Sequence, residues 1–396
     1  MRDLLVEEVV AQRKGSIKIG PFGSALPRSA MVRDGVKVYG QENLISRDWS
    51  IGDRRITPET FEMLRSCELN PGDVVIGMMG SLGHCEVFPS GAEPGIMDSH
   101  LLRIQTDRGL LIPEYLRLLL LSGETIQQID RLSHGSIMAG LSSRVVRTLR
   151  VLVPPVEEQL RIAEALNTID ETIHSTKNLI CKLELQERGM KQSLIGSHQG
   201  VDDIWKEIRV GELGRIVTGT TPPTSDDRYW DGEVPFVTPG DIDTAGNVVA
   251  TNRTVTQFGA SLGKIVPAGS IAVVCIGSTV GKMGWITQSS VTNQQINCIV
   301  PSGQYLSEFI YYILELVRPN IEAEAGRQAI PIVNANLLSM LPVFVCPLDI
   351  QKEIIINITP IRDRIRQERQ MLSKYVNLRS GLATDLLSGR VRMVAA

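Results

Sequence analysis

The stretch VPPVEEQLRIAEALNTIDETI, residues 153–173, has the spacing of the entry into one long helix. The same spacing returns 192 residues later as VCPLDIQKEIIINITPIRDRI, residues 345–365. Proline followed by acidic residues in the first turn favours a helix start in both copies. An internal repeat of this length determines the architecture of the whole chain.

Apolar residues recur in both copies in steps of four and three, which is typical of helices that pack along a shared apolar edge. The polar exceptions fall at the same two steps, Thr176 and Glu187 in the first copy and Glu368 and Arg379 in the second. The predicted helix-helix seam consists of Ile162, Leu166, Ile169, Ile173, Ile180, Leu183, Met190, Leu194, Ile354, Ile358, Ile361, Ile365, Leu372, Tyr375, Leu382 and Leu386.

Helices of ~40 residues would be ~60 Å long, which exceeds the width of a small domain. We therefore expect the two helices to pack against each other, the alternative being that each lies on its own globular domain. Similar units in one chain tend to close with approximate two-fold symmetry, which makes the helices antiparallel. Pro360 predicts a kink or a fresh helix start in the second copy, whereas Thr168 stands at that step in the first.

The rest of the chain predicts two heads of ~150 residues, a normal size for one domain. NPGDVVIGMMGS (70–81) matches VPAGSIAVVCIGS (266–278) as a turn and a buried strand, and IPEYLRLLLLS (112–122) matches LSEFIYYILEL (306–316) as a short apolar helix. The predicted fold is α+β, a pseudo-two-fold tandem repeat with two similar heads separated by two long antiparallel coiled-coil helices. The predicted divisions are a first head at 1–152, a first helix at 153–200, a second head at 201–344, and a second helix with a tail at 345–396.

Charge and cysteine content restrict the class of protein. The chain carries 41 Lys and Arg against 44 Asp and Glu, whereas dedicated nucleic-acid binders usually have a basic surplus. Only residues 347–396 are basic, with 9 Lys and Arg against 5 Asp and Glu, and a solvated helix face explains that surplus equally well. The six cysteines lack a C-x-x-C spacing, so we expect neither a zinc ribbon nor disulfides, and a reducing cytoplasm fits best. A leader peptide and a membrane-spanning run are not expected either.

Motifs for catalysis, metals and cofactors are missing. GSTVGKMG (277–284) lacks the spacing and the Ser or Thr of a phosphate-binding loop, and GPFGS (20–24) is not the F-x-G-x-G of S-adenosylmethionine binding. Methyltransferase motifs of the N-P-P-[FY] or D-P-P-Y kind are absent, and no lysine has the acidic residue two positions earlier that a metal-dependent nuclease needs. His84 and His134 fit ordinary loop histidines better than a base or a DNA contact. These gaps favour a recognition or scaffolding protein without a bound metal or cofactor.

Five stretches together carry a family resemblance. They are VPPVEEQLRIAEALNTID (153–170), CPLDIQKEIIINITPI (346–361), WKEIRVGELGRIVTG (205–219), YWDGEVPFVTPGDI (229–242) and DLLSGRVR (385–392). The chain resembles the DNA specificity subunit of type I restriction-modification systems over nearly its full length, in the order head, helix, head, helix. The first head has no counterpart to DDRYWDG (226–232) and offers VRDGVKVYGQENL (32–44) instead, which implies two unlike half-sites.

The resemblance implies that each head is a target recognition domain that reads one half of a bipartite site in double-stranded DNA, and that the helices set the unread gap. It implies no catalysis by this chain. The implied partners are two modification subunits, which hold S-adenosylmethionine and methylate adenine N6, and restriction or translocase subunits, which use ATP and Mg. Two alternatives stay open, a coiled-coil scaffold or adaptor whose heads bind proteins, and an enzyme with a dispersed site in one head.

Few phosphate contacts are expected, because Lys and Arg number 18 against 18 Asp and Glu over residues 1–155 and 9 against 14 over residues 198–346. We therefore expect weak DNA binding by the isolated chain, with sequence readout by a few polar side chains. Tyr229 and Trp230 fit packing roles in a turn better than stacking on bases. The predicted DNA contacts are Lys18, Arg28, Arg33, Arg54, Arg55, Ser136 and Arg144 in the first head, and Arg228, Tyr229, Lys264, Lys282, Arg327, Gln328 and Asn334 in the second.

Overall fold

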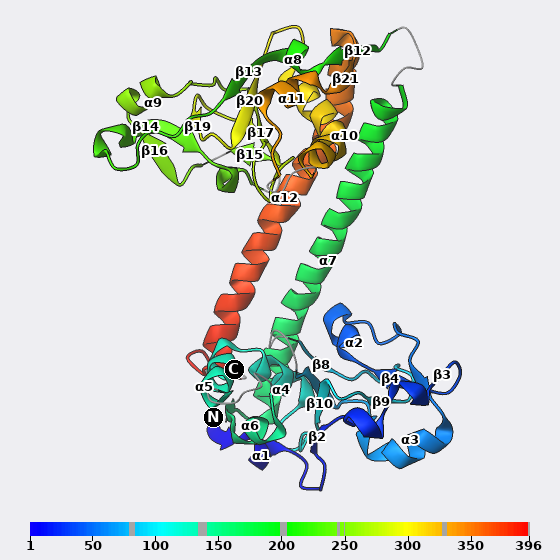
Figure 1. The fold of residues 1–396 in the computed structure, drawn as a ribbon. Coiled ribbons are helices and arrows are strands. Elements are labelled where there is room, and N and C mark those ends of the chain that lie inside the picture. The colour runs from blue at the N-terminus through cyan, green and yellow to red at the C-terminus, as the bar shows by residue number, and fades with distance from the viewer. Residues whose placement is uncertain are drawn as a thin grey trace. The chain divides into compact units, whose positions relative to one another are not determined.

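The computed structural model describes residues 1–78, 84–133, 141–198, 204–243, 246–248, 250–326 and 331–394 (Figure 1). The chain divides into two compact units. Unit 1 comprises Met1–Ser175 and Leu372–Ala396, and unit 2 comprises Thr176–Met371. Each unit therefore contains one head, the first part of one long helix and the last part of the other.

Both predicted long helices are present. Helix α7 spans Val156–Leu194 with 39 residues, and α12 spans Leu348–Leu387 with 40 residues. All of the predicted seam residues are buried or half-buried, and so are the residues at the two polar steps, Thr176, Glu187, Glu368 and Arg379. The apolar repeat therefore marks the covered side of each helix, as the sequence predicts.

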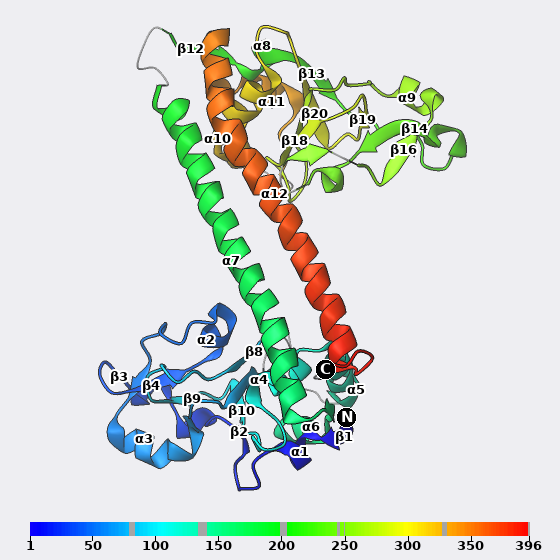
Figure 2. The same ribbon diagram turned by 180° about the vertical axis from the view of Figure 1, so that it is seen from behind.

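The two helices pack against each other in antiparallel fashion within each unit (Figures 1 and 2). In unit 1, Arg379 Nε lies 3.0 Å from an oxygen of Asp170. In unit 2, a guanidinium nitrogen of Arg369 lies 2.6 Å from an oxygen of Glu184. In unit 1, Glu158 also pairs with Arg392, and in unit 2, Ile195 also shares a core with Ile354. Within each unit, therefore, higher residue numbers along the first helix meet lower ones along the second, and the antiparallel prediction is confirmed.

Of the two outcomes predicted at Pro360, a kink or a fresh helix start, the fresh start is wrong. Helix α12 begins at Leu348 and continues through Pro360. The preceding turns are held in the core of the second head by the buried residues Ile354 and Ile358, while the proline itself is exposed. Burial of these side chains offsets the hydrogen bond that the proline removes.

Each head contains an antiparallel sheet of the same strand order. In the first head the order is β2-β10-β7-β8, and in the second it is β13-β20-β17-β18 with β15 added in parallel at the edge. The strands of the first sheet are β2 (Ile17–Ile19), β7 (Val74–Gly77), β8 (Cys85–Val87) and β10 (Leu101–Ile104). Those of the second are β13 (Gly214–Thr218), β15 (Asn247–Val248), β17 (Ile271–Val274), β18 (Met283–Ile286) and β20 (Ile296–Pro301). The weak sequence echo between the heads thus reflects a shared topology.

The heads differ in a further sheet that each carries. In the first head its order is β3-β5-β4-β9-β6, and in the second it is β16-β14-β19. Strand β4 pairs in parallel with β9, and β14 pairs in parallel with β19. The central strands β4 and β14 therefore correspond between the heads, although the residues that precede them do not. The bounds are β3 (Met31–Val32), β4 (Val36–Tyr39), β5 (Arg55–Ile56), β6 (Glu68–Leu69), β9 (Gly95–Met97), β14 (Trp230–Val237), β16 (Arg253–Val255) and β19 (Val291–Thr292).

Short helices surround these sheets. In the first head they are α1 (Val6–Val9), α2 (Gln41–Ser46), α3 (Pro58–Leu64), α4 (Pro113–Leu120), α5 (Gly123–Ser133) and α6 (Ser143–Thr148). In the second they are α8 (Val210–Leu213), α9 (Gln257–Leu262), α10 (Ser307–Ala325) and α11 (Ala335–Met340). The prediction of a short helix is confirmed for α4, but its counterpart α10 is longer, with 19 residues.

Each head is closed by a strand pair at the point where the chain enters the long helix. Strand β1 (Arg2–Leu5) pairs with β11 (Arg150–Val153), and β12 (Lys206–Arg209) pairs with β21 (Pro342–Val345). The short helices that follow β1 and β12 are held in the same way in both heads. Val6, the first residue of α1, donates its N–H to the carbonyl of Leu149, and Val210, the first residue of α8, donates its N–H to that of Leu341.

The core of each head includes both long helices. Ile162 and Leu166, near the start of α7, share a core with Leu386, at the end of α12, and the helices of the first head. Ile354 and Ile358, near the start of α12, share a core with Ile195, just beyond α7, and the second head. The two alternatives for the helices therefore both hold, because each helix packs on its own head and also along the other helix.

Candidate nucleic-acid interface

Three of the predicted DNA contacts in the first head bind other side chains of that head. Lys18, on β2, donates to the hydroxyl of Ser66. Arg54 forms ion pairs of 2.9 Å with Asp98 and 2.6 Å with Glu42. Arg55 pairs with the carboxylate of Glu93. Carboxylates therefore already neutralise Arg54 and Arg55, whereas Lys18 bonds a neutral hydroxyl and keeps its positive charge.

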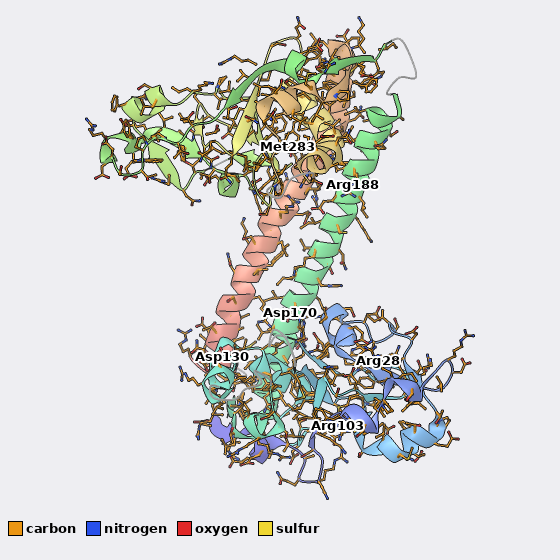
Figure 3. All side chains as sticks on the ribbon, viewed as in Figure 1. Arg28, Arg103, Asp130, Asp170, Arg188 and Met283 are labelled. Carbon is orange, nitrogen blue, oxygen red and sulfur yellow. The ribbon has the colours of Figure 1, made fainter. Side chains whose placement is uncertain are left out.

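Three other predicted contacts in the first head are exposed cations. Arg28, Arg33 and Arg144 lie at the surface and make no ion pair with any residue that the structure describes (Figure 3 for Arg28). An unpaired guanidinium gives up only water when it binds a phosphate, so these three are the best placed to neutralise a DNA backbone. Ser136 lies outside the described residues.

The second head holds most of its predicted contacts in local structure. Arg228 donates to Asp226 through two nitrogens, at 2.9 and 2.7 Å. Lys282 donates to the carbonyl oxygen of Pro239 at 3.0 Å. Asn334 is the N-cap of α11, and its side-chain oxygen accepts the N–H of Leu337 at 2.8 Å. Lys264 is exposed without an ion pair in the described part of the chain, and Arg327 and Gln328 lie outside that part.

The aromatic residues of the second head pack as the sequence suggests. Trp230 is buried, its indole N–H donates to Pro223 O, and the guanidinium of Arg253 lies 3.5 Å from its ring centroid. Tyr229 stacks on Phe258, with ring centroids 5.1 Å apart. Phe258 is itself exposed, so this pair lies at the surface of the head.

Two buried glutamines anchor the long helices to the heads, and neither is among the residues predicted from the sequence. Gln159 accepts the N–H of Ile112 at 2.9 Å, and its amide donates to the carbonyls of Leu110 and Pro154. Gln351, at the same step of the repeat, accepts the N–H of Leu306 at 2.9 Å and donates to Cys346 O at 2.8 Å. Each side chain thus joins the start of its helix to the first turn of α4 or α10.

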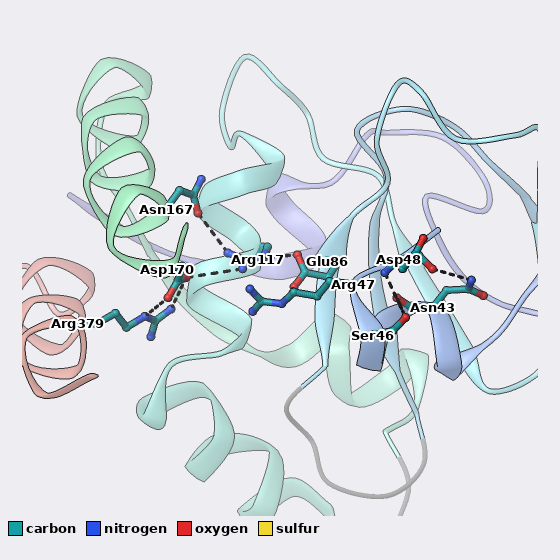
Figure 4. A network of polar contacts seen from close by, with 9 residues as sticks. All are labelled: Asn43, Ser46, Arg47, Asp48, Glu86, Arg117, Asn167, Asp170 and Arg379. Atoms are coloured by element: carbon teal, nitrogen blue, oxygen red, sulfur yellow. Dashed lines mark hydrogen bonds and ion pairs between the residues drawn. The ribbon is translucent and has the colours of Figure 1, made fainter. Parts of the chain in front are cut away.

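A chain of alternating charges extends from the first head to both long helices (Figure 4). Arg117 of α4 is buried and donates to Glu86 of β8 at 2.9 Å. Its guanidinium also lies 3.7 Å from Asp170 of α7, and Asp170 pairs with Arg379 of α12. At the other end, Arg47 pairs with Glu86 at 2.8 Å. Each buried charge therefore has a partner of opposite sign, as charges in a low dielectric require.

The second head meets its helices through a different cluster. The guanidinium of Arg362, on α12, lies 4.1 Å from the ring centroid of Tyr311 and 4.9 Å from that of Trp285. Burial alone would lower the pKa of Arg362, but the tyrosines and the carboxylates of Glu315 and Glu187 outweigh burial and raise it. Lys191 of α7 joins the same region with ion pairs of 2.8 Å to Glu315 and 3.0 Å to Glu187.

The C-terminal segment of unit 1 is held by one buried carboxylate on α7. Both oxygens of Glu158 accept from Arg392, at 2.8 and 2.7 Å, and one also accepts the N–H of Met393 at 3.0 Å. Arg161 in turn donates to Met393 O at 2.8 Å. The hydrogen bond from Arg392 lowers the pKa of Glu158 although burial opposes that shift.

We expect substitution of Glu158 to lower the free energy of unfolding by an amount that depends on pH, because the wild-type carboxylate titrates and its glutamine replacement does not. A carboxylate whose pKa is lowered in the folded state contributes stability above its unfolded pKa of about 4.3, and loses it as the pH falls through the folded pKa. E158Q should lower the free energy of unfolding by about 2 kcal/mol at pH 7, because hydrogen bonds to a charged group are lost. The gap between wild type and variant should shrink below about pH 4.3 in denaturant titrations.

The matched control for this prediction is E157Q, on the adjacent exposed position. Its stability should follow that of the wild type within about 0.5 kcal/mol at every pH. An E158Q gap that keeps its size from pH 7 to pH 3.5 would contradict the assigned ion pair.

Within the described residues, no group of three or more His, Cys, Asp or Glu side chains is arranged to hold a metal ion. Burial raises the pKa of the Cys275 thiol to about 11 and of Cys298 and Cys346 to about 12, which disfavours thiolate chemistry. None of the described helices combines the length and apolar character of a membrane span.

The sequence and the structure are similar to those of one family. The model of the type I restriction modification DNA specificity domain matches twice, at residues 36–185 and 203–374. The type I restriction enzyme HindI specificity subunit of Haemophilus influenzae is 34% identical over 119 residues, which cover 30% of this chain and 25% of that protein. The EcoR124I/EcoR124II specificity subunit of Escherichia coli is 25% identical over 171 residues, 40% of this chain and 41% of that protein. The chain thus spans less than half of either relative.

Solved structures share the fold at low sequence identity. The type I restriction-modification S subunit from M. genitalium has a TM-score of 0.65 and 13% identity, covering 98% of this chain and 96% of that one. A chain from a structure on complex assembly and conformational transition of the type I R-M system has a TM-score of 0.52 and 16% identity, covering 98% and 97%. Since the family model matches most of the sequence in two copies, this chain belongs to the type I restriction-modification DNA specificity family.

Proposed function

We propose that this chain is the DNA specificity subunit of a type I restriction-modification complex, in which each head reads one half of an asymmetric bipartite site. One observation carries the proposal. The two heads share the strand order of their first sheet but differ in their second sheet. Common frames with different surfaces suit two different half-sites.

The long helices are proposed to set the number of unread base pairs between the half-sites. Both helices contribute residues to each unit, and the length of each helix follows from its 39 or 40 residues. Half-sites read from one face of the duplex lie about 34–36 Å apart, which helices of ~60 Å can accommodate.

The proposed partners follow from the family. Two modification subunits would dock on the helices and heads and supply S-adenosylmethionine and the methyl transfer to adenine, while this chain selects the adenines. Restriction subunits that use ATP and Mg would complete the complex, in the cytoplasm. Because the heads have little net positive charge, the modification subunits would also supply much of the positive field that attracts DNA. A purely protein-binding scaffold is not favoured, since both matches are to a DNA specificity domain.

Footprinting of the complex with its modification subunits tests this function through the exposed cations. We expect protection of two segments on one site, and a reduced salt dependence of binding for R28A/R33A/R144A/K264A. Each lost phosphate contact should lower the slope of log K against log salt by about 0.9.

The control is R65A, because Arg65 is also exposed but already pairs with Glu62. Its salt slope should stay close to that of the wild type. A quadruple variant that binds with the wild-type slope would remove these four residues from the interface, and the absence of any footprint would remove the proposed function.

A further inference from the structure

The glutamine anchors bring the two head-helix junctions into register. The N–H of Ile112 and the N–H of Leu306 make the same hydrogen bond, to Gln159 and Gln351. Five residues after these N–H groups stand Arg117 in the first head and Tyr311 in the second. Arg117 and Tyr311 therefore occupy equivalent places, each on the first helix after the central sheet.

The same register relates the helices. Eleven residues after Gln159 and Gln351 stand Asp170 on α7 and Arg362 on α12. We call Asp170 and Arg379 the first seat, because both lie at the junction of the first head. Arg362 and Glu187, at the equivalent steps of the repeat, form the second seat.

The two junctions carry opposite chemistry at these equivalent positions. In the first, the head supplies the buried cation Arg117 and the helix supplies the carboxylate of Asp170. In the second, the helix supplies the cation Arg362, and the head supplies the ring of Tyr311, with Trp285 stacked on it at 4.9 Å, and the carboxylate of Glu315, which pairs with Lys191. The shared fold of the heads therefore does not extend to the contact that seats them.

The two equivalent positions near the helix starts also carry opposite charges, a carboxylate at Asp170 of α7 and a guanidinium at Arg362 of α12. Asp170 pairs with Arg379 in the first seat, whereas in the second Arg362 lies against the rings of Tyr311 and Trp285 and Glu187 pairs with Lys191. At the second seat α7 also supplies the buried cation Lys191, which pairs with Glu187 and with Glu315 of α10. A head thus meets an acidic residue near the start of α7 and a basic residue near the start of α12.

We propose that the two heads are keyed to their seats, with Arg117 and Tyr311 as positioning residues, so that the heads cannot exchange places. The claim that the heads cannot exchange places depends only on these contacts within the protein. Its consequence for DNA, that the keys determine the order of the two half-sites, rests on the proposed function.

Electrostatics explains why an exchange would be unfavourable. The first head on the second seat would bring Arg117 beside Arg362, so that two guanidinium groups would share a mostly buried junction. The second head on the first seat would leave Asp170 facing an aromatic ring in place of a cation. Both errors occur together in an exchanged arrangement, so the discrimination is the sum of two mismatches.

Rewriting the first seat in the full-length chain tests the keys. D170R puts a guanidinium beside Arg117 and Arg379, and we expect the Tm to fall by about 5 °C or more. R117Y/D170R/R379E gives these three positions the residues of their equivalents in the second junction, while Glu86 keeps its ion pair with Arg47, and should regain at least half of that loss. The control E171R, on the adjacent exposed position, should shift the Tm by no more than about 2 °C. A triple variant no more stable than D170R would overturn the keying.

A second test uses a full-length chain with residues 1–152 and 205–344 transposed. The pair R117Y/Y311R should lower the Tm in the natural order and raise it in the transposed order, because each head then carries the residue that its new seat requires. General damage to packing would lower the Tm in both orders, and that outcome, or no gain in the transposed chain, would overturn the proposal.

The readout on DNA separates this inference from the proposed function. Thermal unfolding is measured without DNA. If R117Y/Y311R lowers the Tm in the natural order and raises it in the transposed order, but the methylation map shows no bipartite site, the proposed function is wrong and the keying of the heads is still supported. With both correct, the transposed chain carrying R117Y/Y311R should direct methylation to a site whose half-sites have exchanged order.

Discussion

Adding one heptad to α7 and one to α12 is expected to lengthen the unread gap by about three base pairs while both half-sites stay unchanged. Seven helical residues add ~10 Å, and base pairs repeat every ~3.4 Å. Methylation of the original site should fall by about 100-fold or more, since the two half-sites can no longer be read together. Mapping of methylated adenines in cells that carry the variant complex measures both effects.

The insertion points follow from the contacts of the helices. On α7 the heptad belongs between Asp170 and Glu184, and on α12 between Arg369 and Arg379, so that the ion pair in each unit is kept. A heptad in α7 alone is the control, because it shifts the seam and should abolish specific methylation. A changed half-site with an unchanged gap would refute the role of the helices as a ruler.

Replacement of either anchoring glutamine by leucine is expected to lower the free energy of unfolding more than replacement of any other single polar residue. Q159L leaves the N–H of Ile112 and the carbonyls of Leu110 and Pro154 buried without this partner, and each unsatisfied group costs about 1–3 kcal/mol. We expect a loss of about 3 kcal/mol in the free energy of unfolding, and a similar one for Q351L. Denaturant titration of the full-length chain measures both.

Exposed glutamines of the same helices provide the controls. Q186L on α7 and Q367L on α12 remove no buried hydrogen bond and should change stability by no more than about 0.5 kcal/mol. If Q159L were as stable as Q186L, the anchors would not hold the helices to the heads.

The periodicity of the sequence was sufficient to predict the two helices and their covered side. Ile162 and Ile354 begin seams that burial confirms throughout, because a helix can hide an apolar edge only by packing along another surface. The topology of the heads was less visible, since strands of three or four residues such as β2 and β7 carry few periods of alternation.

The junctions could not be foreseen from single residues. Gln159 and Gln351 stood at one step of the repeat, which was the available signal, but a glutamine in the first turn of a helix is also common at the surface. The pairing of Arg117 with Asp170 joins residues far apart in sequence, and its counterpart replaces the arginine by Tyr311. Likewise, only the structure distinguishes Arg54, which is held by two carboxylates, from Arg28, which has no ion pair in the described chain.

The central claim is that two similar but unequal heads specify one split site at a gap set by the helices. Sequencing of methylated adenines in DNA from cells that contain this chain and its modification subunits tests it most directly. We predict a single asymmetric motif of two short half-sites separated by a constant number of unread bases, with one adenine modified in each half. A continuous motif, a palindromic one, or half-sites at variable spacing would contradict the account.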